Sequence, residues 1–139
     1  MTLDPEGNPH IGYYVPDRTE VRHAYRVGDT WQTEVVATAQ VGLRGLSTAI
    51  APGDKTCVAY YDNLLPGLEL ACRNPDGSWD TEWVDDKGGL SVSLKFDSQG
   101  LAHLSYLGIG GFGNSLYYTV QGKTVSENKV QVMIPFVSR

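Results

Sequence analysis

The sequence is poor in several features that mark common classes of protein. It has two cysteines, and its 11 Lys or Arg residues stand against 16 Asp or Glu residues, which gives a formal net charge of −5. No run of basic residues is present to neutralise the phosphates of a nucleic acid. No window approaches the roughly 18 apolar residues that cross a bilayer, and residues 1–10 lack the basic and apolar regions of a signal peptide. We therefore expect no nucleic-acid partner, no membrane partner and a cytoplasmic location.

Helical patterns are also missing. Between the turns, no segment keeps apolar residues at the i, i+3, i+4 spacing over a helical length. The chain has 139 residues, of which 41% are hydrophobic and 19% are charged, and this is the size and balance of one folded domain. We therefore predict a single all-β domain that covers residues 1–139.

The strongest feature that is present is an internal repeat. The segments "HIGYY", "CVAYY" and "HLSYL" align one tyrosine column at spacings of 47 and 46 residues: Tyr13, Tyr60 and Tyr106. Downstream, "GDTWQTEVV" matches "DGSWDTEWV", which pairs Trp31 with Trp79 and Glu34 with Glu82. The third copy keeps only "GKTVSENKV", with Val125 in the tryptophan position. Three copies therefore cover nearly the whole chain.

Each copy has the pattern of four short antiparallel strands. The segments "LSTAI" (46–50) and "LSVSLKF" (90–96) are expected first strands, and "DPEGNP", "APGDK" and "DSQG" have turn chemistry. Four strands in about 46 residues are typical of a propeller blade. We place the approximate blades at 1–45, 46–89 and 90–139. A β-sandwich with similar halves is the alternative.

Three blades do not close into a ring, since propellers have about four to eight. The first copy lacks almost all of its first strand, whereas the third continues past its expected fourth strand. We therefore predict a homodimer that forms a six-bladed ring, in which residues 133–139 complete the first blade of the partner chain. A different subunit that carries the remaining blades, or excision of this stretch from a longer propeller, are the alternatives.

These repeats resemble known propeller families. The segments "GDTWQTEVV", "DGSWDTEWV" and "LDPEGNPHIGYY" are similar to bacterial propeller repeats of the form G-x-W-x-x-E-x-V and D-x-x-G-x-P-H-I-x-Y-Y. The "DGSW" and "GDTW" turns also resemble the Asp-box turn of sialidase-type propellers, although they are shorter and lack the leading serine. That resemblance implies a fold and not catalysis. Assembly of partial chains into one ring resembles small lectins whose two-blade chains trimerise, which implies sugar binding.

No residue pattern points to catalysis. Arg26 and Arg73 occupy the same repeat position, and we expect them to pair with Glu34 and Glu82 across the turn within each blade. They therefore do not form the arginine cluster of a sialidase, and no carboxylate pair has a distinguishing context.

One aligned column contains residue types that bind metals: His10, Cys57 and His103. Equivalent positions on adjacent sheets lie about 10 Å or more apart, which is too far for ligands of one zinc ion. We therefore expect no metal and no cofactor.

The two cysteines are expected to face each other. In a hairpin where Tyr61 lies opposite Leu68, Cys57 lies opposite Cys72. Because the chain shows no signal peptide, we favour two free thiols over a disulfide, which would need an oxidising compartment.

The loops between second and third strands, and those between blades, differ from copy to copy, as binding loops do. Their polar groups and aromatic platforms are the candidate ligand-binding residues: Tyr14, Asp17, Arg18, Arg44, Tyr61, Asp62, Asn63, Asp86 and Phe112. We predict a non-catalytic recognition module for a glycan or a protein surface. A glycosidase, sialidase-like enzyme or lyase whose site forms only in the ring is one alternative, and a structural assembly protein is another. Aromatic sites repeated between blades would favour a lectin.

Overall fold

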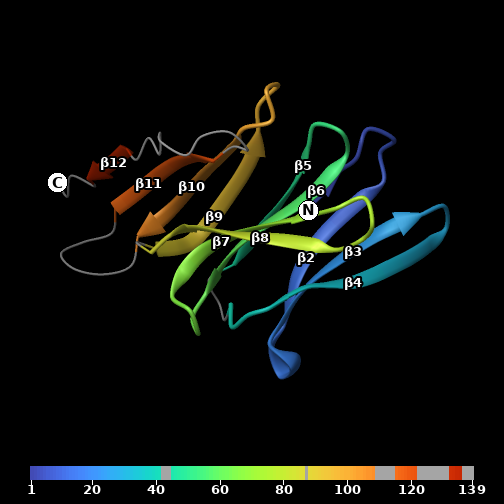
Figure 1. Ribbon diagram of the computed structural model, residues 1–139, viewed down its shortest axis with the longest axis horizontal. Coiled ribbons are helices and arrows are strands. Elements are labelled where there is room, and N and C mark those ends of the chain that lie inside the picture. Colours follow the sequence, from blue (N-terminus) through green and yellow to red (C-terminus); the bar gives the residue numbers. More distant parts are fainter. Residues whose placement is uncertain (42–44, 87, 109–114, 122–131, 136–139) are drawn as a thin grey trace.

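The chain folds into three four-stranded antiparallel sheets, each formed by a consecutive stretch of sequence (Figure 1). The structure is a computed structural model that describes residues 1–41, 45–86, 88–108, 115–121 and 132–135, the last four by their backbone alone. The prediction of an all-β fold is confirmed. The sandwich alternative is wrong, because the strands form three sheets and not two.

Within each sheet the strands follow one another in chain order. The first sheet contains β1 (Thr2–Leu3), β2 (Pro9–Val15), β3 (Glu20–Val27) and β4 (Thr30–Thr38). The second contains β5 (Leu46–Ala51), β6 (Lys55–Asp62), β7 (Gly67–Arg73) and β8 (Trp79–Asp85). The third contains β9 (Gly88–Phe96), β10 (Ala102–Gly108), β11 (Ser115–Gln121) and β12 (Val132–Pro135). A short 3₁₀ helix, η1 (Pro16–Arg18), joins β2 to β3.

The repeat seen in the sequence is a structural repeat. The same hairpin recurs in each sheet, because the register pairs His10 with Tyr25, Cys57 with Cys72, and His103 with Val120. These register positions define which residues are equivalent from sheet to sheet.

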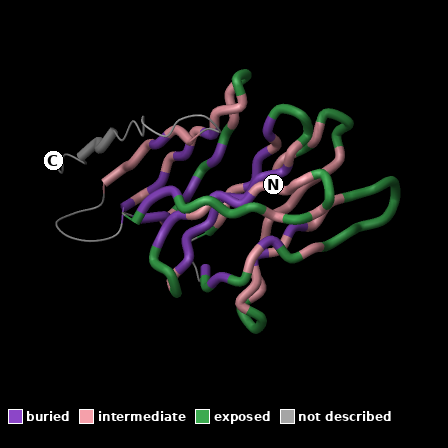
Figure 2. The backbone as a smooth tube through the Cα atoms, viewed as in Figure 1, coloured by how far each residue is buried: buried purple, intermediate pink, exposed green. Residues whose placement is uncertain are grey.

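The second sheet lies between the other two and is covered on both faces. Val58 and Tyr60 pack with the first sheet's Val21, whereas Cys57 and other residues of alternate parity on β6 pack with the third sheet's Leu104. This division follows from the two-residue period of a strand, which sends successive side chains to opposite faces. Figure 2 shows buried backbone concentrated in this middle region.

A glycine allows the first two sheets to approach closely. The backbone N–H of Gly12 on β2 donates a 2.9 Å hydrogen bond to Oγ1 of Thr48 on β5. A Cβ atom at position 12 would lie 2.5 Å from that oxygen. Only the absence of a side chain there permits this contact.

The turn between β7 and β8 is organised by its own side chains. Oδ1 of Asp76 accepts hydrogen bonds from the backbone N–H of Ser78, at 2.9 Å, and from its hydroxyl, at 2.6 Å. Gly77 has a positive φ of 89°, which glycine adopts readily. This turn, part of the Asp-box-like segment, is held by contacts within itself.

The ends of the chain agree in part with the sequence analysis. β1 has two residues against six in β5, so the first sheet has an abbreviated first strand. The fourth strand of the third sheet is β12, and Tyr118 pairs with Val132. The earlier placement of that strand around Val125 is therefore wrong, although Val125 itself lies outside the described residues. Residues 133–135 pair with β11 of their own chain, and the predicted role of 136–139 in a partner concerns residues outside the described part.

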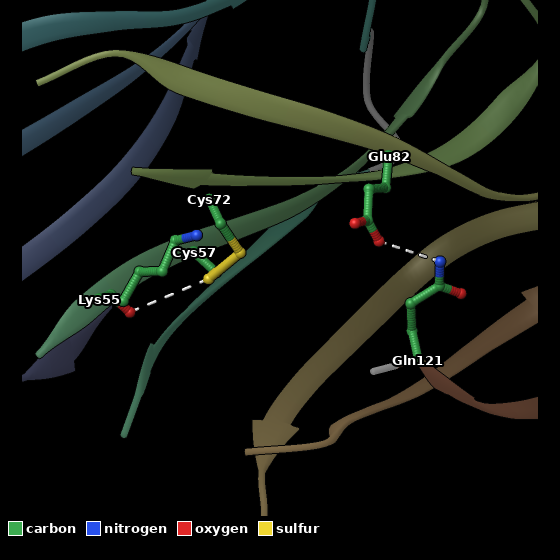
Figure 3. Close-up of a disulfide and its surroundings, with 5 residues drawn as sticks. All are labelled: Lys55, Cys57, Cys72, Glu82 and Gln121. Carbon is green, nitrogen blue, oxygen red and sulfur yellow. Dashed lines mark hydrogen bonds between the residues drawn. A yellow bond between two sulfur atoms is a disulfide. The ribbon is translucent and has the colours of Figure 1, made fainter. Parts of the chain in front are cut away.

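The cysteines form a disulfide, so the expectation of free thiols is wrong (Figure 3). The predicted register is confirmed: Tyr61 faces Leu68, and Cys57 faces Cys72 with their Cα atoms 4.1 Å apart. Directly opposed residues of an antiparallel pair are close enough to bond, and this geometry outweighs the argument from compartment. The cytoplasmic location stays a prediction, and it loses the support that free thiols would have given.

In the part of the chain described above, no helix has the length and apolar character that crossing a membrane requires.

Candidate ligand pockets between the sheets

A pocket of about 470 Å³ lies between the first and second sheets. We call it pocket A. Its walls on the first sheet are His10, His23 and Tyr25, and on the second sheet they include Lys55, Thr56, Arg73 and Asn74. Turn residues 52–54 form part of its rim. It therefore lies where the β5–β6 turn approaches the β2–β3 hairpin.

Three aromatic rings form a stacked platform in pocket A. The ring centroids of His10 and His23 lie 5.1 Å apart, and those of His23 and Tyr25 lie 4.9 Å apart. The strand register explains this arrangement, because His10 is opposite Tyr25 and His23 precedes Tyr25 by two residues on the same face. The guanidinium carbon of Arg73 lies 5.8 Å from the centroid of the Tyr25 ring, within cation–π range.

A chain of hydrogen bonds connects the two sheets behind this platform. Nε of Arg73 donates to Oε1 of Glu34 at 2.7 Å, and NH2 donates to Oε2 at 3.1 Å, which is a bidentate pair. Nδ1 of His23 lies 3.0 Å from Oε1 of Glu34, and its Nε2 lies 3.0 Å from Nδ1 of His10. Because Glu34 only accepts, we infer that His23 carries its proton on Nδ1 and accepts from His10. Glu34 thus holds both Arg73 and His23 in position.

The electrostatics of this chain follow from burial and pairing. His23 is 1% exposed, and its burial lowers its pKa, so the ring is neutral near pH 7. Burial acts to raise the pKa of Glu34, but the hydrogen bonds from Arg73 and His23 outweigh it and leave the pKa below its ordinary value. The hydrogen bond to Glu34 raises the pKa of Arg73. Pocket A therefore contains the positively charged Arg73, which the negatively charged Glu34 holds in position.

The expected ion pairs within each sheet are wrong. Arg73 bonds to Glu34 of the neighbouring sheet, Arg26 donates to Asp29 at 2.8 Å, and Glu82 accepts from Gln121. The reason is the alternation of the strand. Arg26 is paired with Trp31 on one face of the first sheet, and Glu34 lies three residues after Trp31, on the opposite face.

A second pocket, pocket B, has a volume of about 420 Å³ and lies between the second and third sheets. It is the repeat equivalent of pocket A. The disulfide Cys57–Cys72 occupies the positions of His10 and Tyr25, and Leu70 occupies that of His23. Pocket B therefore has an apolar floor in place of the aromatic platform.

The hydrogen bond that links the sheets is also repeated in pocket B. Nε2 of Gln121 donates to Oε2 of Glu82 at 3.1 Å, and Figure 3 shows the two side chains pointing toward each other beside the disulfide. The two partners are 39 residues apart in the sequence, as Glu34 and Arg73 are. A neutral donor thus replaces the arginine.

The candidate residues from the loops lie elsewhere. Figure 1 shows η1 and the β6–β7 loop at the lower edge of the molecule, whereas the β5–β6 turn beside pocket A is at the upper edge. Asp17, Arg18 and Asp86 are exposed, and Asn63 donates from its backbone N–H to Gln40 O. None of the described candidates lines pocket A or pocket B.

Three of the candidates belong to the scaffold. Tyr61 is 6% exposed and packs in the core, and Tyr14 is half-buried against the core between the first two sheets. Asp62 is 4% exposed, and its Oδ1 accepts from the backbone N–H groups of Gln40 and Leu64. Tyr14 lies on β2, and Tyr61 and Asp62 lie on β6, so these residues belong to strands that pack in the core and not to exposed loops. Arg44 and Phe112 lie outside the described residues.

Sequence reasoning missed the residues that form pocket A. His10 stood in an aligned column but was weighed only as a metal ligand, and Arg73 only as a partner within its own sheet. The available signal was parity: His23 and Tyr25 are two residues apart on one strand, so they share a face with His10 across the hairpin. Applied to each strand, that rule would have placed His10, His23 and Tyr25 on one face of the first sheet.

Comparisons with known proteins bear on the fold. No family model matches the chain, and the curated proteins include no sequence match. A solved structure, a fucose lectin from Kordia zhangzhouensis in complex with methyl-fucoside, matches with a TM-score of 0.62 and 12% sequence identity. The match covers 99% of this chain and 97% of that chain. The two chains share a fold. At this identity the likeness extends to the arrangement of the strands alone.

Proposed function

We propose that this protein is a non-catalytic sugar-binding protein and that pocket A is its primary site. The observation that carries the proposal is the combination, in one pocket, of a stacked aromatic platform with a fixed arginine. Aromatic faces pack against the C–H groups of a sugar ring, while a few placed polar groups fix its hydroxyls. The shared fold with a fucose lectin supports a deoxy sugar such as fucose as the first ligand to test.

The residues of pocket A have distinct roles in this proposal. Tyr25 and His10 offer ring surface, and Arg73, Lys55 and Asn74 offer hydrogen-bond donors at the rim. The Arg73 guanidinium is already oriented by Glu34, so little conformational entropy is lost when a hydroxyl binds. Glu34 is a positioning residue, and its lowered pKa leaves it without the proton that a glycosidase acid must donate.

Titration calorimetry with methyl fucoside tests the proposed site. Removal of one hydrogen bond to a charged group costs about 1.5–3 kcal/mol, so R73A should weaken binding by about tenfold to a hundredfold. The matched control is R18A, which removes an exposed arginine in η1 at the other end of the sheets. Loss of binding in R18A, with R73A unchanged, would move the site to the loops.

The sheets are proposed to be blades of a six-bladed ring formed by two copies. Trp79 packs against the core between the first two sheets and meets His23 edge-on at 5.6 Å. Its equivalent, Trp31, lies on the outer face of the first sheet and is 51% exposed. Val35 on the same face is 44% exposed. A second copy that covers this face as the first sheet covers Trp79 would bury both side chains.

Light scattering tests the assembly. Two copies of the 15.2 kDa chain should scatter as one particle of twice that mass. A particle of single-chain mass at micromolar concentration would contradict the ring and leave the proposal for pocket A standing, since both of its walls come from one chain.

A further inference from the structure

The outer face of the third sheet contains a cluster that repeats one wall of pocket A. Nε2 of His103 lies 3.2 Å from Oδ2 of Asp97, and its Nδ1 bonds with the hydroxyl of Tyr118. These residues are the equivalents of Asp4, His10 and His23 in the first sheet. The repeated cluster has the same order: a turn carboxylate, a histidine on the second strand and a polar ring on the third.

This cluster faces away from the second sheet. Along β10 the residues alternate between buried ones that pack toward the second sheet, such as Leu104 and Tyr106, and half-buried ones on the other side, such as His103. The side chain of His103 is 32% exposed, whereas that of His10 is 13% exposed beneath the second sheet. The third sheet therefore presents half of a pocket.

The outer face of the first sheet presents the other half. Arg26 and Trp31 are paired across β3 and β4, as Arg73 and Trp79 are paired across β7 and β8. Arg73 and Trp79 lie on the face of the second sheet that packs against the first sheet. In the proposed ring, Arg26 and Trp31 of one copy meet His103 and Tyr118 of the other in the same way.

Among the positions that differ between the sheets, the one opposite His23 in the first sheet matters most for charge. The register places Glu34 opposite His23 and Glu82 opposite Leu70, but Val132 opposite Tyr118. The residue at the position that neutralises Arg73 in pocket A is thus a valine in the third sheet. At the junction of two copies, Arg26 therefore lacks the glutamate that its equivalent has.

Asp97 and Asp29, which bond to His103 and Arg26, do not replace that glutamate. Asp97 accepts hydrogen bonds within its own turn. The bond from the backbone N–H of Leu101 lowers the pKa of Asp97 most, and the bond with the ring of His103 lowers it further. Asp29 bonds to Arg26, but its side chain is fully exposed, and exposed ion pairs are weak. An incoming anion can compete for the guanidinium.

We propose that each junction of the two-copy ring forms a further pocket, pocket C, which binds an anionic sugar. This proposal rests on the proposed ring. Arg26 of one copy binds the carboxylate or sulfate of the ligand, and Tyr118 and His103 of the other copy pack against the sugar ring, while Trp31 packs in the junction as Trp79 does between the first two sheets. Pockets A and C then divide the ligands: neutral sugars bind within a chain, and acidic sugars bind between chains.

Titration calorimetry with the methyl glycoside of glucuronic acid and with a sulfated galactoside tests pocket C, and methyl fucoside serves as the neutral reference. At least one of the two anionic probes should bind at one site per chain, and the affinity should fall as salt is raised. R26A should weaken that binding at least tenfold while fucoside binding stays unchanged. R73A should give the reverse result. Which of the two anionic probes binds decides between uronic and sulfated sugars.

V132E is the sharpest variant, because it restores a carboxylate at the position of Glu34 and Glu82. It should abolish binding of the anionic sugar and leave fucoside binding and particle mass intact. Anionic binding that survives both V132E and R26A, or its absence in a wild-type protein of dimeric mass, would overturn pocket C. Neither outcome affects pocket A, which R73A tests separately.

Mixing two variant chains tests whether the pocket is shared. H103A and R26A each damage both junctions of their own dimer. When the two proteins are unfolded together and refolded, each mixed dimer has one junction with both changes and one junction with neither. Anionic sugar binding should therefore reappear at half a site per chain of mixed dimer. Failure to recover any binding in dimers shown by mass to be mixed would contradict a pocket built from two copies.

Discussion

The first and second sheets are copies of one pattern, yet they differ in burial. On β6 every residue from Thr56 to Asp62 is buried, whereas on β2 every residue is only half-buried. The second sheet has a neighbour on each face and the first has one. The number of packed neighbours explains this difference, because each covered face of a strand removes alternate side chains from water.

The largest expected effect is on stability, at the tyrosine that recurs in each sheet. Tyr60 is fully buried, so Y60A should lower the free energy of unfolding by about 3–5 kcal/mol, as other large-to-small core changes do. The equivalent change in the first sheet, Y13A, should lower the free energy of unfolding by less than half of that amount. It should instead reduce the fraction of protein in the proposed dimer. Urea unfolding and light scattering measure the two effects. Equal losses, with no change in mass for Y13A, would show that the two faces are alike.

The disulfide gives the next effect. Cys57 and Cys72 are 15 residues apart, and closing a loop of that length stabilises a fold by about 3 kcal/mol in the chain-entropy model. C57A/C72A should lose about that amount in urea unfolding. A reducing agent should destabilise the wild type to a similar level and leave the double variant unchanged. A wild type that is indifferent to reduction would contradict a stabilising role.

The next prediction concerns Trp31, at the proposed junction of two copies. Because Trp79 is packed and Trp31 is exposed, W31A should raise the dissociation constant of the dimer at least tenfold, about 1.4 kcal/mol. Sedimentation over a range of concentrations measures it. The matched control is L64A, which removes an exposed leucine from the β6–β7 loop and should leave the constant unchanged. A W31A dimer as tight as the wild type would place the junction elsewhere.

The smallest effect is the pH dependence of the first sheet. Burial lowers the pKa of His23, so the unfolded chain takes up a proton at a higher pH than the folded one. Stability is then fully present above the ordinary histidine pKa of 6.5 and falls as the pH drops through it. The free energy of unfolding measured from pH 8 to pH 5 should show this fall, and H23Q should flatten it. A wild-type curve that rises toward pH 5 would contradict a buried neutral ring.

Much of the fold was predictable from the sequence because it depends on local rules. The repeat indicated the number of sheets. The turn chemistry indicated that β5 begins at Leu46 and that β9 ends at Phe96, although β9 begins at Gly88, two residues earlier than expected. The register of the β6–β7 hairpin placed Cys57 opposite Cys72 from one assumed pair. The fourth strand of the third sheet was misplaced because "GKTVSENKV" has too few landmarks to align.

The pockets between the sheets were less predictable, because they depend on contacts between sheets. The bond between Arg73 and Glu34 joins residues that no turn or hairpin brings together. Loop variability suggested residues such as Tyr61 and Asp62. In the structure Tyr61 is buried, and Asp62 accepts a hydrogen bond from the backbone N–H of Gln40. The alternation of side chains along each strand would have shown which residues share a face. Which sheet packs against that face could be known only from the three-dimensional structure.

The bonds from Arg73 to Glu34 and from Gln121 to Glu82 both run from the third strand of one sheet back to the fourth strand of the sheet before it. The series is therefore polar, with a leading end and a trailing end that differ in chemistry. In the proposed ring, the leading end of one copy would meet the trailing end of the other. Head-to-tail contacts of this kind form a closed ring if the rotation between neighbouring units closes and an open fibre if it does not.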